Sequence, residues 1–580
     1  MSGLRSQRWF GGHDLAGFIH RASIHAEGIS RAALEGRPVI GICNPWSELV
    51  SCNLHFRGLA EAARRGVLLA GGLPLEFPTI SLGENLMKPT TLLYRNLMAM
   101  DVEESIRAYP FDAVVLLAGC DKTVPAELMG AVSADVPAIM VTGGPSEAAW
   151  FRGKRLGAGT DLWHYVEEVR AGRMSQDEFD ELEAASLPGV GHCNEMGTAS
   201  TMTSIVEALG MCLPGSASIP AVDAARVRVA EASGARAVEL AREGLRPSQI
   251  VTAESLDNAI TLLMAIGGGT NAVIHLLALA GRAGVPLGLD RFDDLSRSTP
   301  LLANVRPSGE HLVEDLHRAG GIRAVLHELG PLLHGDALTV TGRTLAEETR
   351  AAAPLDRDLI ASLDAPRSAE GGLAVLHGSL APLGAVIKRS AASAELLRHR
   401  GPALVFDSIH DLAARIDDPS LDVRADSVLV LRNAGPRGGP GMPEWGQLPI
   451  PRRLLGQGVT DMVRISDARM SGTAFGTVVL HVAPESAAGG PLLAVRDGDP
   501  IVLDIDERRL SLDIPADQLA RRLETAPPPA PPYRRGYGAM YLDHVEGADR
   551  GCDFDFLRSL PGEPAESEPL GLLSGWIGGW

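Results

Sequence analysis

The chain has 580 residues, a formal net charge of −19 at pH 7 and a hydrophobic fraction of 45%. This length exceeds what one hydrophobic core supports, so we expect at least two domains. The acidic balance argues against nucleic acid or an anionic membrane surface as the main partner. An anionic substrate would need local cations, such as bound metals, to draw it in.

The chain shows no targeting segment and no convincing membrane span. Residues 1–12 contain two arginines and no long apolar stretch, so no secretory signal is visible and we expect a cytoplasmic protein. Residues 259–281 lack Asp, Glu, Lys and Arg over a length that could span a bilayer. Gly267-Gly268-Gly269-Thr270-Asn271 interrupts that stretch, which favours a glycine turn followed by a buried helix.

The first two-thirds of the chain alternates apolar strand patterns with amphipathic helical patterns. The predicted strands and helices lie, in chain order, at 38–42, 56–70, 113–119, 126–134, 138–141, 200–209, 223–243 and 271–283. This alternation predicts βαβ units and a parallel sheet covered by helices. Residues 160–186 are charged and helical, and we expect them to form an exposed insertion.

The pattern changes near residue 378, at a turn-rich junction. Short strand patterns follow at 427–431, 477–481 and 501–505, separated by glycine and proline clusters, and they predict a barrel-like β-rich domain. We therefore predict an α/β fold in two domains, with the parallel sheet in residues 1–377 and the β-barrel in residues 378–560. We expect residues 561–580 to form a tail that is disordered or docked on a neighbouring subunit.

The six cysteines form no CxxC pair, and their number gives no sign of a disulfide framework. We assign Cys43, Cys212 and Cys552 as buried structural residues. Cys52, Cys120 and Cys193 lie in loops after apolar segments. Three thiolates from separate loops could hold zinc or an iron–sulfur cluster. With a [2Fe–2S] cluster, three thiolates leave one iron position open to act as a Lewis acid on a substrate oxygen.

Cys120 has the most informative position, because Asp121 and Lys122 follow it directly at the end of the strand predicted at 113–119. Open α/β sheets bind ligands just beyond the carboxyl ends of their strands. Glu84 and Glu444 also lie in glycine-bearing loops, and carboxylate oxygens suit Mg²⁺. A lone glutamate is more often a solvated surface group.

Ser471 lies in the polar turn Ser466-Asp467-Ala468-Arg469-Met470-Ser471-Gly472. A serine in such a turn is most often a turn former or a helix cap. No GxSxG elbow and no Ser-His-Asp order surrounds it, so the sequence does not support a hydrolase.

These motifs, taken in order, resemble the dihydroxy-acid and sugar-acid dehydratase family over about residues 5–558. The matching segments are CNPWSE at 43–48, CNLH at 52–55, CDKTVP at 120–125, GHCNEMGTA at 191–199 and SDARMSG at 466–472. The opening segment 4–10 and the segment 549–556 are similar to the pentonate branch, whose substrates are L-arabinonate and D-xylonate.

The resemblance implies two metal centres. It implies that Cys52, Cys120 and Cys193 bind a [2Fe–2S] cluster. It implies a Mg²⁺ site made by Glu84, Asp121, Lys122 and Glu444, with the lysine carbamylated. An ammonium cannot bind a cation, whereas a lysine of depressed pKa can react with carbon dioxide and offer an oxygen.

The resemblance further implies that Ser471 is the base of a hydro-lyase that dehydrates a 2,3-dihydroxy sugar acid to a 2-keto-3-deoxy acid. In this expectation the enzyme is a homodimer or homotetramer that acts on a small molecule. Glu195 departs from the family pattern, where a smaller or neutral residue is expected. Its charge beside a cluster ligand could alter substrate preference.

Other interpretations stay open. The substrate could be a branched-chain dihydroxy acid, or a phosphorylated gluconate cradled by the glycine turn at 267–271. From another class, the chain could be a non-catalytic iron–sulfur protein, although an electron carrier usually supplies four protein ligands to its cluster. A structural protein that binds only zinc is a third possibility.

Overall fold

A parallel sheet organises the N-terminal part of the chain in the computed structural model, which describes residues 3–527 and 529–559. Its strands lie in the order β2-β1-β3-β4, with bounds β1 Val39–Asn44, β2 Leu73–Pro78, β3 Ala113–Ala118 and β4 Ala138–Thr142. Every residue of β1, β3 and β4 is buried, as expected for strands covered by helices on both faces. The predicted helix-covered parallel sheet is confirmed.

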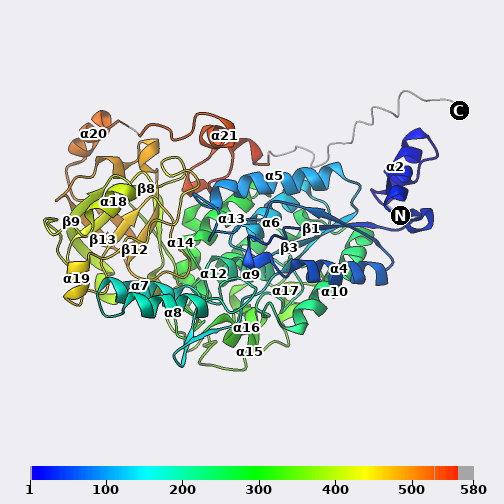
Figure 1. The fold of residues 1–580 in the computed structure, drawn as a ribbon, viewed down its shortest axis with the longest axis horizontal. Helices are drawn as coiled ribbons and strands as arrows, with labels where there is room; N and C mark the ends of the chain where they lie inside the picture. The colour runs from blue at the N-terminus through cyan, green and yellow to red at the C-terminus, as the bar shows by residue number, and fades with distance from the viewer. Residues whose placement is uncertain (1–2, 528, 560–580) are drawn as a thin grey trace.

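The helices of this part are numerous and mostly amphipathic. They are α1 Gln7–Phe10, α2 Leu15–Ala26, α3 Arg31–Leu34, α4 Phe56–Leu69, α5 Leu92–Ala108, α6 Thr123–Ala134, α9 Thr198–Ala208, α10 Ala224–Glu243, α11 Pro247–Ile250, α12 Ala253–Ala265, α13 Asn271–Arg282, α14 Leu289–Ser298, α15 Val313–Arg318, α16 Gly321–Glu328 and α17 Leu345–Thr349. In Figure 1, α5 and α6 lie above the sheet, whereas α4 and α10 lie below it.

The uncharged stretch at 259–281 is divided between α12 and α13 by a tight turn. Gly267 in this turn has a φ of 58°. The backbone of Gly372 packs against it so closely that a methyl group on Gly372 would lie 2.5 Å from the Gly267 Cα. Close packing therefore explains these glycines. Within residues 3–527 and 529–559, no helix is long and apolar enough to cross a membrane.

The segment 160–186, predicted as an exposed insertion, forms α7 Thr160–Arg170 and α8 Gln176–Ala185, and a short hairpin of β5 Ala149–Phe151 and β6 Lys154–Leu156 precedes it. No residue of α7 is fully buried, as the prediction requires. Its first residue is nevertheless tied to the second domain, because Thr160 Oγ1 donates to the carbonyl of Thr473 at 2.9 Å. Figure 1 shows α7 running below the barrel.

The C-terminal part contains a closed barrel, which confirms the predicted β-rich architecture. Its strands run in the order β10-β11-β12-β8-β7-β14-β13-β9, and their bounds are β7 Ala374–Gly378, β8 Ala381–Ile387, β9 Arg398–Phe406, β10 Val428–Leu431, β11 Arg464–Ser466, β12 Val478–Ala483, β13 Pro500–Asp504 and β14 Arg509–Leu512. Three short helices lie outside it, α18 Ile409–Arg415, α19 Arg452–Gly456 and α20 Ala516–Thr525. The boundary expected between residues 377 and 378 falls inside β7, and the division there stays a prediction.

After the barrel the chain returns to the first sheet through α21, Gly536–His544. Arg282 of α13 pairs with Asp553 at 2.6 Å, and both side chains are buried. Arg95 of α5 donates to the carbonyl oxygen of Cys552 at 2.9 Å. The segment 536–559 therefore holds the second half of the chain against the first (Figure 1). The tail predicted at 561–580 lies outside the described residues.

The contact between α4 and α10 gives a stability prediction. A methyl group at Gly66 of α4 would lie 1.8 Å from the carbonyl oxygen of Glu231, so Gly66→Ala must push the two helices apart. We expect a loss of about 1–3 kcal/mol of unfolding free energy in chemical denaturation. Gly58 in the same helix has no atom within 4 Å of an added methyl, so Gly58→Ala is the control and should gain about 0.5–1 kcal/mol. Equal unfolding free energies for Gly66→Ala and Gly58→Ala would contradict the close packing of α4 on α10.

Candidate active site

A cavity of about 320 Å³ opens at the carboxyl end of β3, and Cys52, Cys120 and Cys193 all line it. Glu84 and Asp121 lie in the same wall. The structure thus brings together three thiols that are 68 or more positions apart in the printed sequence with two of the predicted Mg²⁺ ligands. This confirms that the three loops converge, while the identity of what they bind stays a prediction.

Local hydrogen bonds fix the cysteine loops. The backbone N–H of Cys120 donates to Thr123 Oγ1 at 2.8 Å, which joins the end of β3 to the start of α6. Cys52 lies in the 3₁₀ turn η1, Ser51–Asn53. This turn packs directly on Gly119, since a methyl group added at Gly119 would lie 2.8 Å from the Cys52 carbonyl oxygen. The Cys193 carbonyl accepts from Ser200 Oγ of α9 at 2.9 Å.

The thiols are poorly suited to ionise alone. The pKa of Cys52 is raised, first by its hydrogen bond with the Cys120 thiol and then by burial. Burial, followed by the charge of Glu195, raises the pKa of Cys193 well above its usual value. A buried thiolate needs a positive partner, so Cys52 and Cys193 at one cavity fit a group that brings its own positive charge.

Lys122 gathers the second set of predicted ligands. Its side chain is fully buried, and its Nζ lies 3.2 Å from Glu84, 3.5 Å from Asp121 and 3.4 Å from Glu444. Glu444 comes from the barrel part of the chain, whereas the other two follow β2 and β3. Every residue predicted for the Mg²⁺ site therefore surrounds one nitrogen atom.

The charge state of Lys122 differs from the expectation of a depressed pKa. Burial and the neighbouring Arg469 lower its pKa, but the carboxylates of Glu84, Glu444 and Asp121 together outweigh them, so the pKa lies above its ordinary value. The expected depressed pKa is therefore wrong for the protein without metal. Within residues 3–527 and 529–559, no three or more His, Cys, Asp or Glu side chains already stand in the arrangement of a metal site, and the Lys122 ammonium lies among the carboxylates.

The Glu84 carboxylate is held as an anion. Burial alone would raise the pKa of Glu84. The charges of Lys122 and Arg469 and the hydrogen bonds from Thr90 and Thr91 outweigh burial and bring the pKa down to about 2. Thr90 Oγ1 donates to Glu84 Oε1 at 2.6 Å. The carboxylate thus stays charged at any physiological pH, as a metal ligand must.

Arg469 joins the two halves of this carboxylate set. It is fully buried and donates to Glu444 Oε1 at 2.9 Å, to Thr90 Oγ1 at 2.9 Å and to the carbonyl of Met442 at 2.8 Å. Because Thr90 in turn donates to Glu84, one guanidinium fixes a carboxylate from each part of the chain. Asn271, the first residue of α13, adds a donor to Glu444 Oε1 at 3.2 Å.

Ser471 is not among the residues that line the cavity, but its turn packs beside the Cys193 loop. A methyl group at Gly472 would lie 2.5 Å from the backbone nitrogen of Thr198, where α9 begins. The carbonyl of Met470 accepts from Asn271 at 3.3 Å. The turn is therefore tied both to the start of α9 and to a residue that contacts Glu444.

Glu195 has a structural explanation. Its side chain is fully buried, and its Oε1 accepts from the backbone N–H groups of Gly159 and Thr160, both at 2.8 Å. A carboxylate at the N-terminus of α7 is favoured by the unpaired N–H groups and the helix dipole. The departure from the family pattern thus fastens the insertion to the Cys193 loop.

Sequence reasoning missed several residues of the site: Arg469, Asn271, Thr90, Thr91 and Thr473. Arg469 lies inside the SDARMSG motif and was given no role there. A signal was present, since an arginine between apolar residues in a glycine-ended turn needs a buried partner.

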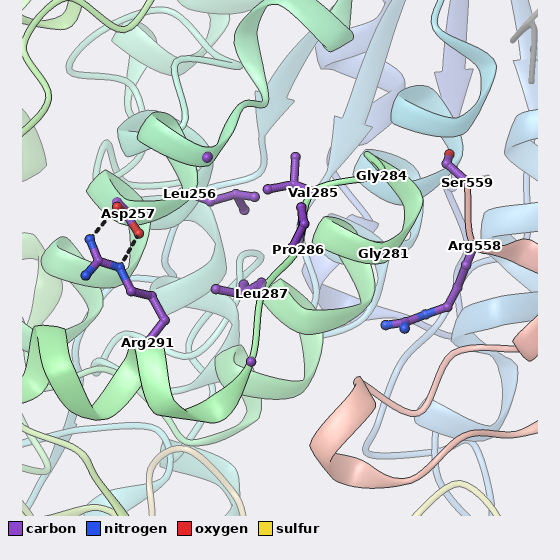
Figure 2. Close-up of a pocket in the computed structure, with 12 residues that line it drawn as sticks. Leu256, Asp257, Gly281, Gly284, Val285, Pro286, Leu287, Arg291, Arg558 and Ser559 are labelled. Carbon is purple, nitrogen blue, oxygen red and sulfur yellow. Dashed lines mark hydrogen bonds and ion pairs between the residues drawn. The ribbon is translucent and has the colours of Figure 1, made fainter. Parts of the chain in front are cut away.

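A larger cavity of about 750 Å³ lies elsewhere and contains none of the predicted site residues (Figure 2). Its wall includes Leu256, Val285 and Leu287, and Arg291 is paired there with Asp257 at 2.6 Å. It lacks thiols and a cluster of free carboxylates, so size alone does not mark the functional site.

Comparisons with known proteins agree with this geometry. The N-terminal family model of dihydroxy-acid/6-phosphogluconate dehydratases matches residues 37–348, and the C-terminal model matches residues 358–552. An L-arabonate dehydratase from Azospirillum brasilense is 53% identical over 97% of this chain and 98% of its own length. A 6-deoxy-6-sulfo-D-gluconate dehydratase from Pseudomonas putida is 49% identical over 98% of each chain. A dihydroxy-acid dehydratase from Moorella thermoacetica is 42% identical over 93% of this chain and 98% of its own length.

Two fully buried lysines give a matched stability test. Lys122→Met removes the ammonium shared by three carboxylates and leaves Arg469 paired with Glu444 alone, and we expect the metal-free protein to lose about 3–5 kcal/mol. Lys388 has no hydrogen-bond partner for its Nζ, and burial lowers its pKa to about 7. Lys388→Met should therefore cost nothing or stabilise the protein.

The Lys388 comparison also has a pH signature. The folded protein releases the Lys388 proton at about pH 7, whereas the unfolded chain keeps it until about pH 10.5. The unfolded state binds more protons in that window, so wild-type stability should rise relative to Lys388→Met between pH 7 and 10. Thermal unfolding at several pH values measures this, and a constant difference would contradict an unpaired Lys388 amine.

Proposed function

This chain belongs to the dihydroxy-acid/6-phosphogluconate dehydratase family, and on that premise we propose that it is a hydro-lyase acting on a sugar acid such as L-arabinonate or D-xylonate. The product is the corresponding 2-keto-3-deoxy acid. The observation that carries the proposal is the adjacency of Cys120, Asp121 and Lys122, which places a thiol of one donor set directly beside members of the other. The similarity to an L-arabonate dehydratase supports a sugar acid as the substrate class.

The residues fit two metal centres. Cys52, Cys120 and Cys193 would hold a [2Fe–2S] cluster, and Glu84, Asp121, Glu444 and a carbamylated Lys122 would hold Mg²⁺. When bound, these centres supply Lewis acidity toward the leaving hydroxyl and the substrate carboxylate.

The chain's own groups carry the proton chemistry. Ser471, entering the step as an alkoxide, takes the C2 proton at its Oγ and becomes a neutral hydroxyl, the electron pair of the C2–H bond forms the C2–C3 double bond, and the 3-hydroxyl leaves with its bonding electrons. Together the proton and the hydroxide make one water. The enol that remains becomes the 2-keto acid when C3 gains a proton and the C2 hydroxyl loses its own. Arg469 and Asn271 hold Glu444 in place throughout, because both donate to its Oε1.

The alternatives account for less of the site. A non-catalytic iron–sulfur protein would have no use for Arg469 and Lys122 arranged around three carboxylates. A branched-chain dihydroxy acid would use the same two centres, so substrate screening must separate it from a sugar acid. The relative named for dihydroxy acids is less similar to this chain than the two named for sugar acids.

The proposal includes a cytoplasmic homodimer or homotetramer. The helix α2 presents Leu15, Phe18 and Ile19 on its exposed surface, with side chains 39%, 63% and 39% accessible. This spacing puts them on one helical face. An exposed apolar face of this kind is typical of a helix that packs against another subunit.

The cluster assignment is tested by replacing one cysteine at a time. Anaerobically purified wild-type protein should contain iron and labile sulfide and absorb in the visible range. Cys120→Ala should lose most of that absorption, because it removes one of three ligands. Cys212→Ala, at a buried cysteine that does not line the cavity, is the control and should keep it. Equal iron contents in the two variants would contradict the assignment.

The activity is tested by incubating the anaerobic protein with Mg²⁺ and a panel of aldonic acids, 2,3-dihydroxyisovalerate and 6-phosphogluconate, and measuring 2-keto acid formation. We expect a pentonate to have the highest kcat/KM. Ser471→Ala should lower kcat by about 10²- to 10⁴-fold, the usual contribution of a positioned base, with the visible absorption unchanged. Loss of absorption in this variant would make the serine structural, and no turnover of any acid by wild type would refute the function.

A further inference from the structure

Thr473 lies two residues after Ser471 and is almost completely buried, with 4% of its side chain exposed. Its Oγ1 is 2.9 Å from Ser471 Oγ, and either oxygen can be the donor. Its backbone N–H also points at Ser471 Oγ, at 3.4 Å. Within residues 3–527 and 529–559, Ser471 Oγ is the one side-chain hydrogen-bond partner of the Thr473 hydroxyl.

Two glycines hold the Thr473 side chain in this orientation. A methyl group at Gly159, just before α7, would lie 2.2 Å from Thr473 Oγ1. A methyl group at Gly197, just before α9, would lie 2.9 Å from Thr473 Cγ2. The side chain is therefore enclosed by two bare backbone segments, so the rotamer of Thr473 has little freedom.

The segment on the Gly159 side is itself fastened. Thr160 Oγ1 donates to the Thr473 carbonyl at 2.9 Å, and Glu195 accepts from the N–H groups of Gly159 and Thr160. The insertion that the sequence marks as an exposed surface feature thus supplies one wall around Thr473. Its contact with the Cys193 loop, through Glu195, keeps that wall in register with the cavity.

A serine that accepts a proton from carbon must present electron density at Oγ, and hydrogen bonds donated to that oxygen stabilise the charge that develops there. Resting on the function proposed above, we propose that Thr473 is a positioning residue of the dehydration, whose hydroxyl donates to Ser471 Oγ. In the step it supports, Ser471 starts as the alkoxide, the C2–H bond breaks, its proton goes to Ser471 Oγ to give the neutral hydroxyl, and its electron pair forms the C2–C3 double bond as hydroxide leaves C3. The Thr473 hydroxyl keeps its own proton throughout and fixes the direction in which Ser471 Oγ points.

The test compares Thr473→Val with Thr473→Ser. Valine keeps the buried volume and removes the hydroxyl, so kcat should fall by roughly 10- to 100-fold, the effect of one lost hydrogen bond to a charged acceptor, with KM within about threefold of wild type. Serine restores the donor and should keep kcat within about threefold of wild type. With substrate deuterated at C2, the primary isotope effect on kcat should be larger in Thr473→Val than in wild type, because proton removal becomes slower. A role in packing alone would not produce this combination.

Gly159→Ala is a second variant that leaves both hydroxyls in the chain. The added methyl group must displace Thr473 Oγ1, so kcat should fall and the isotope effect should rise as in Thr473→Val. Gly189→Ala is the matched control, since nothing lies within 4 Å of its added methyl group. If Thr473→Val does not fold, Gly159→Ala decides the question.

Several outcomes would overturn the proposal. These are a kcat of Thr473→Val within twofold of wild type, a Thr473→Ser variant as slow as the valine variant, or a normal kcat in Gly159→Ala. An inactive Ser471→Ala beside a fully active Thr473→Val would refute the role of Thr473 and leave the proposed function standing. Absence of dehydration by wild type on every acid tested would instead refute the function itself.

Discussion

The buried ammonium of Lys122 holds three carboxylates that the fold brings from separate places, Glu84 after β2, Asp121 after β3 and Glu444 from the barrel part. Three like charges cannot share a buried site without a cation, because their mutual repulsion and their desolvation would both oppose folding. At this carboxylate set, the contact between the two halves of the chain is therefore stabilised by the Lys122 ammonium in the metal-free protein. Arg469 reinforces it by binding Glu444 directly and Glu84 through Thr90.

This arrangement has a consequence for cofactor loading in the proposed enzyme. The carboxylates raise the pKa of Lys122, so the amine is protonated and unreactive toward carbon dioxide in the metal-free protein. Mg²⁺ in the proposed site would favour the neutral amine over that ammonium, and a carbamylated Lys122 would then offer an anionic ligand. Metal binding and lysine modification are then coupled, each favouring the other. The neighbouring thiols have the same need for positive charge, since burial contributes to the raised pKa values of Cys52 and Cys193.

The parts of this molecule that follow from local sequence were predictable. The apolar run at 113–119 specifies a buried strand, and the position of Cys120, Asp121 and Lys122 at its carboxyl end places them at the ligand-binding edge of the sheet. Glu444 was identified from its glycine-bearing loop and the family resemblance, and Ser471 from its motif, because residue spacing does not say which side of a barrel loop faces the rest of the chain. Arg469 escaped notice because its partner Thr90 is 379 positions away, and no periodicity connects two such residues.

The charge state of Lys122 and the contacts of α7 were harder to predict, because they too depend on residues that are far apart in the sequence. The pKa of Lys122 depends on the balance between burial and three carboxylates, and only the folded arrangement sets that balance. The insertion at 160–186 was predicted as an exposed feature from its composition, yet the two residues at the start of α7 meet Glu195 and Thr473. The composition of a segment describes its average exposure, whereas the contacts that matter for the proposed dehydration are made only at the N-terminus of α7.

In the proposed enzyme, Lys122 would exchange an ammonium for a carbamate when the carboxylate set takes up Mg²⁺. Nuclear magnetic resonance of the anaerobic protein with ¹³C-bicarbonate tests this directly. We predict a carbamate carbon signal that appears on addition of Mg²⁺, is absent without it and is absent in Lys122→Arg. Full activity and Mg²⁺ binding with no carbamate signal would contradict the account.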